Sequence, residues 1–372
     1  MQQNQHRTWA EIDLAVIEKN FHNIQKYVGN KPVMAVVKAD AYGHGSVRVA
    51  RRLERAGAAR FAVATVDEAV ELREQGIRLP ILILGYVDEA DAPLVARYDL
   101  AAPVYDTETA VLFSQAAQRT GRTIRVHFKL DTGMTRLGFA AGPDTVDQIC
   151  RLSALPGLLA EGLFTHFAVS DTPDGQDFTA QQVDAFRAVA EGLEQAGLHI
   201  PVKHCANSGG VLQYKESYFD MVRAGILLYG YYPDPGLPRP IALQPAMTLK
   251  ARVVQVRPVE PGRTVSYGRT YTVPHPLREA VLSIGYADGY LRTGSGRAHV
   301  LVDGCKAPVL GRICMDMCMV ALPDEARVRR GDAVTIFGPA GVTADDVAQA
   351  ADTIPYEVLC AVSARVPRIY LE

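Results

Sequence analysis

Residues 33–57, "VMAVVKADAYGHGSVRVARRLERAG", begin with a short apolar run and end with a helix-like pattern that stops at a glycine. A glycine just after the last periodic residue is a common helix stop. The same order of apolar run and helical pattern recurs up to about Tyr232. Alternating strands and helices predict a parallel sheet. Eight such strands in roughly 240 residues predict a (β/α)8 barrel, a TIM-like α/β fold.

The strands and helices can be placed from these patterns. The apolar runs are "VMAVVK" (33–38), "FAVATV" (61–66), "ILILG" (81–85), "LAAPV" (100–104), "IRVHFKL" (124–130), "GLFTHF" (162–167), "VKHCANS" (202–208) and "MVRAGI" (221–226). The clearest helical patterns cover residues 46–57, 65–76, 107–121 and 178–197, and an earlier helix is expected near 13–29.

The pattern changes after "YYPDPGLPRP" (231–240), which is rich in proline and glycine. Beyond it, short β-like stretches are separated by turns, and only residues 343–354 and the segment after them appear helical. We therefore expect a barrel domain over residues 1–240 and a mostly β C-terminal domain over residues 241–372. About the first ten residues are an exception, since they could pair with the C-terminal domain.

Composition narrows the classes of function. The 372 residues are 48% hydrophobic and 22% charged, with a net charge of −2 and no block of like charge, so neither nucleic acid nor an anionic membrane is an expected partner. The start has no apolar signal core, and runs such as "PILILGYV" are far shorter than the ~20 residues of a membrane helix. Six scattered cysteines favour a reducing cytoplasm. "CMDMC" (314–318) lacks the spacing of a zinc ribbon, so no metal is expected.

The catalytic residues of barrel enzymes lie at the carboxyl ends of the strands, and most of the corresponding positions here carry polar side chains. These positions are Lys38, Thr65, Gly85, Lys129, His166, Asn207 with Ser208, and Arg223 with Gly225. A lysine in a partly apolar mouth among other cations has its neutral amine favoured. Such an amine forms Schiff bases, either with a carbonyl substrate, as in aldolases, or with pyridoxal phosphate.

A phosphate site would separate these two possibilities. Barrels commonly bind phosphate after the seventh and eighth strands. The loops there contain "ANSGG" and "RAGI", which offer a hydroxyl and glycines whose backbone N–H groups can approach an anion. Tyr42, just after Lys38, could add a hydroxyl donor, and these features favour the cofactor.

The same residues resemble the alanine racemase family. The matching motifs run in order through both domains and are "AVVKADAYGHG", "HFKLDTGMTRLG", "THFAVSD", "ANSGG", "VRAGILLYG", "VSYGRTY", "IGYADGY", "GRICMDM" and "TIPYEVLC". The resemblance implies interconversion of L- and D-alanine with pyridoxal 5'-phosphate by two bases, in a bacterial homodimer whose sites are shared between chains. It also implies production of D-alanine, a peptidoglycan precursor, and leaves two uses open: synthesis of the cell wall or breakdown of D-alanine.

The resemblance assigns roles to individual residues. Lys38 would bind the cofactor covalently and act as one base, and Tyr267 as the other. The cofactor would be held by Tyr42, Arg136, His166, Ser208, Arg223, Gly225, Ile226 and Tyr356, and the substrate by Arg136, Met315 and Tyr286. Lys129 falls where many members carry a carbamylated lysine. The alternative is an unmodified Lys129 paired with Asp131.

These residue types suit a racemisation. Two bases on opposite faces can remove and return the Cα proton, and the cations His166 and Arg223 would favour the phenolate that a tyrosine base requires. Arginine only donates hydrogen bonds, so a pyridine nitrogen facing Arg223 must accept. The ring is then a weaker electron sink, which should suppress transamination.

Three rival interpretations remain open. A barrel decarboxylase that uses the same cofactor would not explain Tyr267 in "VSYG". A non-catalytic pyridoxal-phosphate carrier built on a lone barrel would not need the residues after the barrel, which include Tyr267 and Met315. A racemase for serine or for many amino acids is separated from an alanine racemase only by pocket size, and selectivity for one methyl or hydroxyl group is modest in apolar sites.

Overall fold

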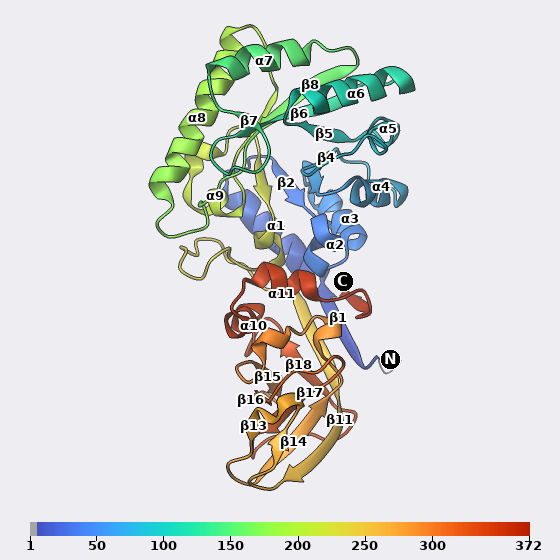
Figure 1. The fold of residues 1–372 in the computed structure, drawn as a ribbon, viewed down its shortest axis with the longest axis vertical. Helices are drawn as coiled ribbons and strands as arrows, with labels where there is room; N and C mark the ends of the chain where they lie inside the picture. Colours follow the sequence, from blue (N-terminus) through green and yellow to red (C-terminus); the bar gives the residue numbers. More distant parts are fainter. Residues whose placement is uncertain (1–5) are drawn as a thin grey trace. The chain divides into compact units, whose positions relative to one another are not determined.

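The computed structural model describes residues 6–372, and their contacts divide the chain into two compact units (Figure 1). The barrel unit contains Glu18–Ala41 and Ser46–Leu243. The C-terminal unit contains residues 6–17, the short insert Tyr42–Gly45, and Gln244–Glu372. The chain therefore leaves the barrel unit at Tyr42, a few residues after the first barrel strand, and returns to it at Ser46.

The barrel unit is a nearly closed ring of eight parallel strands with helices between them, which confirms the predicted fold class (Figure 1). The strand order is β10-β2-β3-β4-β5-β6-β8-β9, and the short β7 pairs with β6. The strands are β2 (Val33–Val36), β3 (Arg60–Val63), β4 (Ile81–Ile83), β5 (Ala101–Val104), β6 (Ile124–Asp131), β7 (Phe139–Ala140), β8 (Leu158–Phe164), β9 (Val202–His204) and β10 (Val222–Ala224).

Helices follow most of these strands, and the long ones match their sequence patterns. Thr65 and Asp106 accept hydrogen bonds from the first turns of α4 and α6, and Gly121 ends α6 in the left-handed conformation, as capping rules require. The helices are α1 (Leu14–Tyr27), α2 (Lys38–Gly43), α3 (Ser46–Ala56), α4 (Val66–Glu74), α5 (Ala92–Arg97), α6 (Thr107–Thr120), α7 (Pro143–Ser153), α8 (Gln176–Gln195) and α9 (Ser208–Gln213), with 3-10 turns η1 (Lys215–Ser217) and η2 (Ile226–Tyr229).

The turn α2 is left-handed. Its four residues from Ala39 to Tyr42 have φ angles between 51° and 53°, although none of them is glycine. For L-residues this conformation costs roughly 1–2 kcal/mol per residue, so neighbouring groups must hold it. The Ala39 N–H donates to Glu68 at 2.6 Å, and the Asp40 carboxylate accepts from the Ser46 N–H at 2.7 Å.

The C-terminal unit is built around a mostly antiparallel sheet in the order β14-β17-β16-β15-β18-β11-β1-β19. Strand β1 pairs antiparallel with β11 and parallel with β19, so residues near the chain start lie in this sheet. The elements are β1 (Thr8–Asp13), β11 (Met247–Val259), β12 (Thr264–Val265), β13 (Tyr271–Thr272), β14 (Leu277–Leu282), β15 (His299–Val302), β16 (Cys305–Leu310), β17 (Cys318–Leu322), β18 (Ala333–Phe337), β19 (Arg368–Leu371), helices α10 (Ala344–Ala351) and α11 (Pro355–Ala361), and 3-10 turns η3 (Tyr267–Arg269), η4 (Tyr286–Asp288) and η5 (Arg292–Gly294).

Strand β11 organises this sheet. Its first half pairs with β1 and β18, and its second half pairs with β14, with a register shift in that pairing between Val253 and Gln255. Buried and partly exposed residues alternate along its first half, as expected for a strand with one face on a core. Within residues 6–372, no helix is long and apolar enough to cross a membrane.

Candidate active site

Lys38 lies at the carboxyl end of the first barrel strand. Strand β2 ends at Val36, and Lys38 is the first residue of the left-handed turn α2, with a half-buried side chain. The amine is therefore at the edge where the other parallel strands also end.

Four cations influence one histidine at this edge. Burial, and then the charges of Arg223, Arg136, Lys38 and Lys129, lower the pKa of His166 well below its ordinary value. His166 is consequently neutral at physiological pH. The expectation that His166 is a cation was wrong, because a buried imidazole among cations loses its proton. The grouping of these five side chains itself follows from parallel strands that end together.

Arg223 is held by groups that leave its guanidinium little freedom. Its Nη1 donates to the His204 carbonyl at 2.8 Å and faces His204 Nδ1 at 2.9 Å. Its Nη2 donates to the carbonyls of Thr165 and Cys205 at 2.8 Å and faces His166 Nδ1 at 3.3 Å. Burial lowers the pKa of Arg223 to about 10, so the side chain remains cationic at neutral pH. None of these partners is a carboxylate.

Lys129 is buried near the end of β6, with its Nζ 5.6 Å from the centre of the Phe164 ring. Burial, and then the charges of Arg136 and Arg223, lower its pKa to about 8. The hydrogen bonds of Asp131 go to the backbone of the following loop: its carboxylate accepts the N–H groups of Gly133, Thr135 and Arg136 at 2.9 to 3.1 Å. Among the described residues no ion pair joins Lys129 to Asp131, so the alternative pairing is not formed.

The loops after β9 and β10 carry the candidate phosphate groups. The Ser208 hydroxyl accepts the Gly225 N–H at 3.1 Å, which leaves its own proton available for another acceptor. The turn η2 begins at Ile226, and the first N–H groups of a helical turn have no partner within it. Asn207 instead caps α9 by accepting from the Gly210 N–H at 2.9 Å, as Thr65 caps α4, so these two residues have structural roles.

Tyr42 and Tyr356 both belong to the C-terminal unit, and their ring centres lie 5.9 Å apart. Burial, and then the neighbouring Cys360, raise the pKa of Tyr42, so its phenol keeps its proton and can donate. The insert that carries Tyr42 is fixed by its backbone: the Gly43 carbonyl accepts from Arg368 Nε at 3.0 Å. A Cβ at Gly45 would lie 1.8 Å from the Tyr370 hydroxyl oxygen, so this position requires glycine.

The candidate second base and substrate residues are exposed on the C-terminal unit. The exposed fractions are 68% for Tyr267, 52% for Met315 and 41% for Tyr286. All three are joined to one segment, residues 312–315. The Ser266 hydroxyl, next to Tyr267, donates to the Arg312 carbonyl, and the N–H of Tyr286 donates to the Cys314 carbonyl at 3.0 Å.

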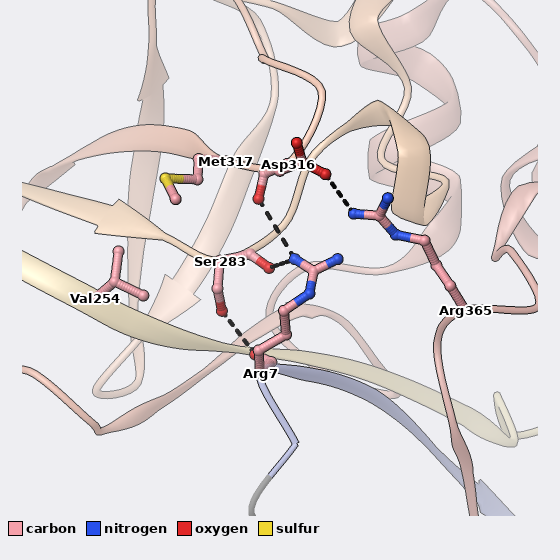
Figure 2. Close-up of a pocket in the computed structure, with 6 residues that line it drawn as sticks. All are labelled: Arg7, Val254, Ser283, Asp316, Met317 and Arg365. Carbon is pink, nitrogen blue, oxygen red and sulfur yellow. Dashed lines mark hydrogen bonds and ion pairs between the residues drawn. The ribbon is translucent and has the colours of Figure 1, made fainter.

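A buried carboxylate fixes this part of the C-terminal unit. Asp288 is fully buried, accepts the Gly285 N–H at 2.9 Å, and pairs with Arg365 at 2.7 Å and with Arg7. Figure 2 shows the pocket that these arginines line, with Arg7 between Ser283 and Asp316 and with Arg365 on the Asp316 carboxylate. Sequence reasoning missed Asp288, although it lies between two glycine-flanked tyrosines in "IGYADGY".

Comparisons with known proteins identify the family. The family model described as "Alanine racemase, N-terminal domain" matches residues 12–233, and "Alanine racemase, C-terminal domain" matches residues 246–370. The chain belongs to the alanine racemase family. An alanine racemase of Desulforamulus reducens is 45% identical over 98% of both chains, and one of Clostridium perfringens is 43% identical over 97% of this chain and 95% of its own.

Solved alanine racemase structures have the same fold throughout. The alanine racemase of Clostridium difficile 630 has a TM-score of 0.95 and 39% identity, over 100% of this chain and 97% of that one. The predicted resemblance to this family is therefore confirmed. The alanine racemase family depends on pyridoxal 5'-phosphate, and two observations in the barrel unit fit this anionic group: the cations around His166, and the Ser208 hydroxyl with a free proton beside Gly225.

Proposed function

We propose that this chain interconverts L-alanine and D-alanine, with pyridoxal 5'-phosphate bound through Lys38. The observation that carries the proposal is the environment of Arg223. A cation held by three carbonyls and two neutral histidines, with no carboxylate, suits a group whose ring nitrogen must stay unprotonated. When bound, pyridoxal phosphate withdraws electrons from Cα of the amino acid and acidifies its hydrogen.

Two residues of the chain would move the Cα proton. Lys38, once its amine is free, can take or return a proton at one face of Cα, and Tyr267 can do so at the other. Arg223 would limit the electron withdrawal, because a guanidinium can only donate to a ring nitrogen and cannot supply it with a negative partner. This restraint would favour return of the proton to Cα, and therefore racemisation over transamination.

Five residues would hold the phosphate. The hydroxyls of Tyr42, Tyr356 and Ser208 can donate hydrogen bonds, and the backbone N–H of Ile226 is a further candidate. Gly225 would contribute by orienting the Ser208 hydroxyl, which accepts its N–H. The raised pKa of Tyr42 supports its part, because a phenol that keeps its proton can donate to an anion without adding negative charge.

Arg136 and Lys129 would form a further pair. With a pKa of about 8, about a tenth of Lys129 is neutral at pH 7, and a neutral amine attacks the carbon of carbon dioxide and releases one proton. The product is an anionic carbamate that can accept hydrogen bonds from Arg136 and fix it against cofactor and substrate. Asp131 does not compete for this role, since three backbone N–H groups already occupy it.

The exposure of Tyr267, Met315 and Tyr286 supports a homodimer with shared sites. Large exposed side chains gathered around residues 312–315 favour cover by a partner surface. We assign cofactor binding to the domain of residues 1–240 and the second base to that of residues 241–372, with Met315 and Tyr286 limiting the substrate site of the neighbouring subunit. A cytoplasmic location in a bacterial cell, where D-alanine serves cell-wall synthesis, completes the proposal.

The test is racemisation of a panel of single amino acids by purified holoenzyme, followed by chiral chromatography. We expect fast interconversion of both alanine enantiomers and slower turnover of serine, because a small pocket discriminates by only ~1–3 kcal/mol per methylene-sized group. Borohydride reduction and peptide mapping should place the cofactor on Lys38. Equal rates for alanine and serine would favour a broader racemase, and no turnover with label on Lys38 would favour a non-catalytic carrier.

A further inference from the structure

A line of five polar side chains connects five strands of the barrel and ends on Arg223. The Nη1 of Arg223 lies 2.9 Å from His204 Nδ1, and His204 Nε2 lies 2.9 Å from His127 Nδ1. His127 Nε2 lies 3.0 Å from a Glu161 oxygen that also pairs with Arg60 at 2.5 Å. From one end to the other, the members lie on β10, β9, β6, β8 and β3.

The direction of every link is fixed by chemistry. A guanidinium has only donors, so His204 Nδ1 must accept and the His204 proton must be on Nε2. That proton is donated to His127 Nδ1, and the His127 proton must then be on Nε2, where Glu161 accepts it. Any other tautomer would place two donors or two acceptors face to face inside the protein, which buried polar groups avoid.

Both imidazoles are fully buried, and neither carries a charge. Burial, and then the charge of Arg223, hold the pKa of His204 well below its ordinary value, and burial also lowers that of His127. Glu161 is ionised instead: burial acts to raise its pKa, but the hydrogen bond from His127 and the contact with Arg60 hold it at about 2. The line is thus two neutral rings between an anion and Arg223.

The backbone is shaped to accommodate this arrangement. Strand β6 pairs Val126 with Ala160 and His127 with Gly162, so Glu161 is the extra residue of a β-bulge on β8. A bulge re-aims one side chain of a strand. Gly162 provides room, since a Cβ there would lie 2.1 Å from His127 Nδ1. A regular strand with an ordinary residue at 162 could not present Glu161 to His127 in this way.

We infer that Glu161 and His127 are positioning residues for Arg223. Through His204 they present an acceptor to its Nη1, so that the guanidinium keeps one orientation and remains a pure donor. The inference rests on the proposed function in one respect, which is the effect of Arg223 on the cofactor. Neither residue touches the reacting atoms; they act through the hydrogen bond at His204.

The first experiment reads the tautomers directly in the holoenzyme. With ¹⁵N-labelled histidine, both His127 and His204 should show a proton on Nε2 and an unprotonated Nδ1. Neither signal should titrate between about pH 5.5 and 8, because both rings are buried and neutral. Each signal is assigned to its histidine by comparison with two variants, one lacking His127 and one lacking His204. A proton on Nδ1 of His204, or a titrating ring, would overturn the inference.

The second experiment breaks the line and then restores its order. His127→Phe keeps a ring but removes both polar atoms, and His127→Leu replaces it where the Phe variant fails to fold. His127→Gln offers an amide oxygen to His204 and an N–H to Glu161 in the original order. The control is Arg125→Gln, because Arg125 lies 3.8 Å from the other Glu161 oxygen and outside the line.

We expect His127→Phe to lower kcat by about ten-fold or more, as loss of outer hydrogen-bond partners does at metal-bound histidines. The visible spectrum of the bound cofactor should shift with it, while His127→Gln and Arg125→Gln stay within about three-fold of wild type. A His127→Phe enzyme with wild-type kcat and spectrum would refute the positioning role. If wild type racemises no alanine but both tautomers are found, the proposed function fails while the hydrogen-bond order stands.

Discussion

The Nη2 of Arg223 lies 3.3 Å from Nδ1 of His166, and burial together with this neighbouring cation keeps the histidine neutral. Because the guanidinium can only donate, His166 Nδ1 accepts and the ring holds its one proton on Nε2. The positive charge near the barrel mouth is therefore carried by arginine and lysine side chains and not by imidazole.

Arg223→Glu should change the chemistry of the site. A carboxylate can share a proton with the ring nitrogen, which strengthens the electron sink. We expect racemisation to slow by about a hundred-fold or more, within the range seen when a preorganised donor is lost. A new long-wavelength absorbance band and measurable pyruvate should accompany the loss. Arg223→Lys keeps a donor-only cation and is the matched control. Unchanged activity and spectrum in Arg223→Glu would contradict the argument.

Lys129 should carry a carbamate whose amount depends on pH. Since the pKa of Lys129 is lowered to about 8, the neutral amine falls about ten-fold for each unit below that value, and at constant dissolved carbon dioxide the carbamate should fall with it. Labelled bicarbonate should give a ¹³C carbamate signal that Lys129→Ala removes and that Lys203→Ala, a control at a lysine paired with Glu194, retains. Added acetate should partly rescue Lys129→Ala. A signal that persists in Lys129→Ala would assign it to another amine.

Mixed dimers test whether sites are shared between chains. Homodimers of Lys38→Ala and of Tyr267→Phe should both be nearly inactive. If each site takes Lys38 from one subunit and Tyr267 from the other, a mixed dimer holds one doubly damaged site and one intact site. Random reassortment of equal amounts should then restore roughly a quarter of wild-type sites, as two-fold symmetry requires. Proven subunit exchange without returning activity would place both bases on one chain.

Asp288→Asn should destabilise the C-terminal unit. The substitution removes the charge that pairs with Arg7 and Arg365 while keeping its size. Losing charged hydrogen bonds at a buried group costs about 1.5–3 kcal/mol, which urea unfolding followed by circular dichroism can measure. Asp316→Asn is the control, because its exposed pair with Arg365 should contribute less than about 1 kcal/mol. Equal effects of the two substitutions would show that burial of Asp288 is not decisive.

The barrel could be predicted because its signals are local and repeated. Apolar runs, helical periodicity and glycine stops each depend on nearby residues, and they located the eight strands and the long helices. Since parallel strands end at one edge, the same reading brought Lys38, His166 and Arg223 together. It also selected Thr65 and Asn207, which cap helices, because a polar residue after a strand serves either purpose.

Other features could not be predicted from local pattern. The charge of His166 depends on burial, which a strand-end position does not give. His127 and Glu161 lie within strands, where no rule about strand ends would find them, and the bulge that aims Glu161 depends on pairing between two strands. The left-handed turn α2 contains alanine and tyrosine as well as aspartate at its positive φ angles, and a run of four such residues without glycine is not a pattern that predicts a left-handed turn.

That turn has a consequence for the handedness of the residues in it. A D-amino acid prefers the mirror image of the conformation that suits an L-residue, so positive φ is the natural region for D-residues. Ala39 has a φ of 51° and is exposed. A semisynthetic chain with D-alanine at position 39 should therefore fold at least as stably as the ordinary chain. The backbone at position 39 would thus accommodate D-alanine, which is one of the two enantiomers that the enzyme is proposed to interconvert.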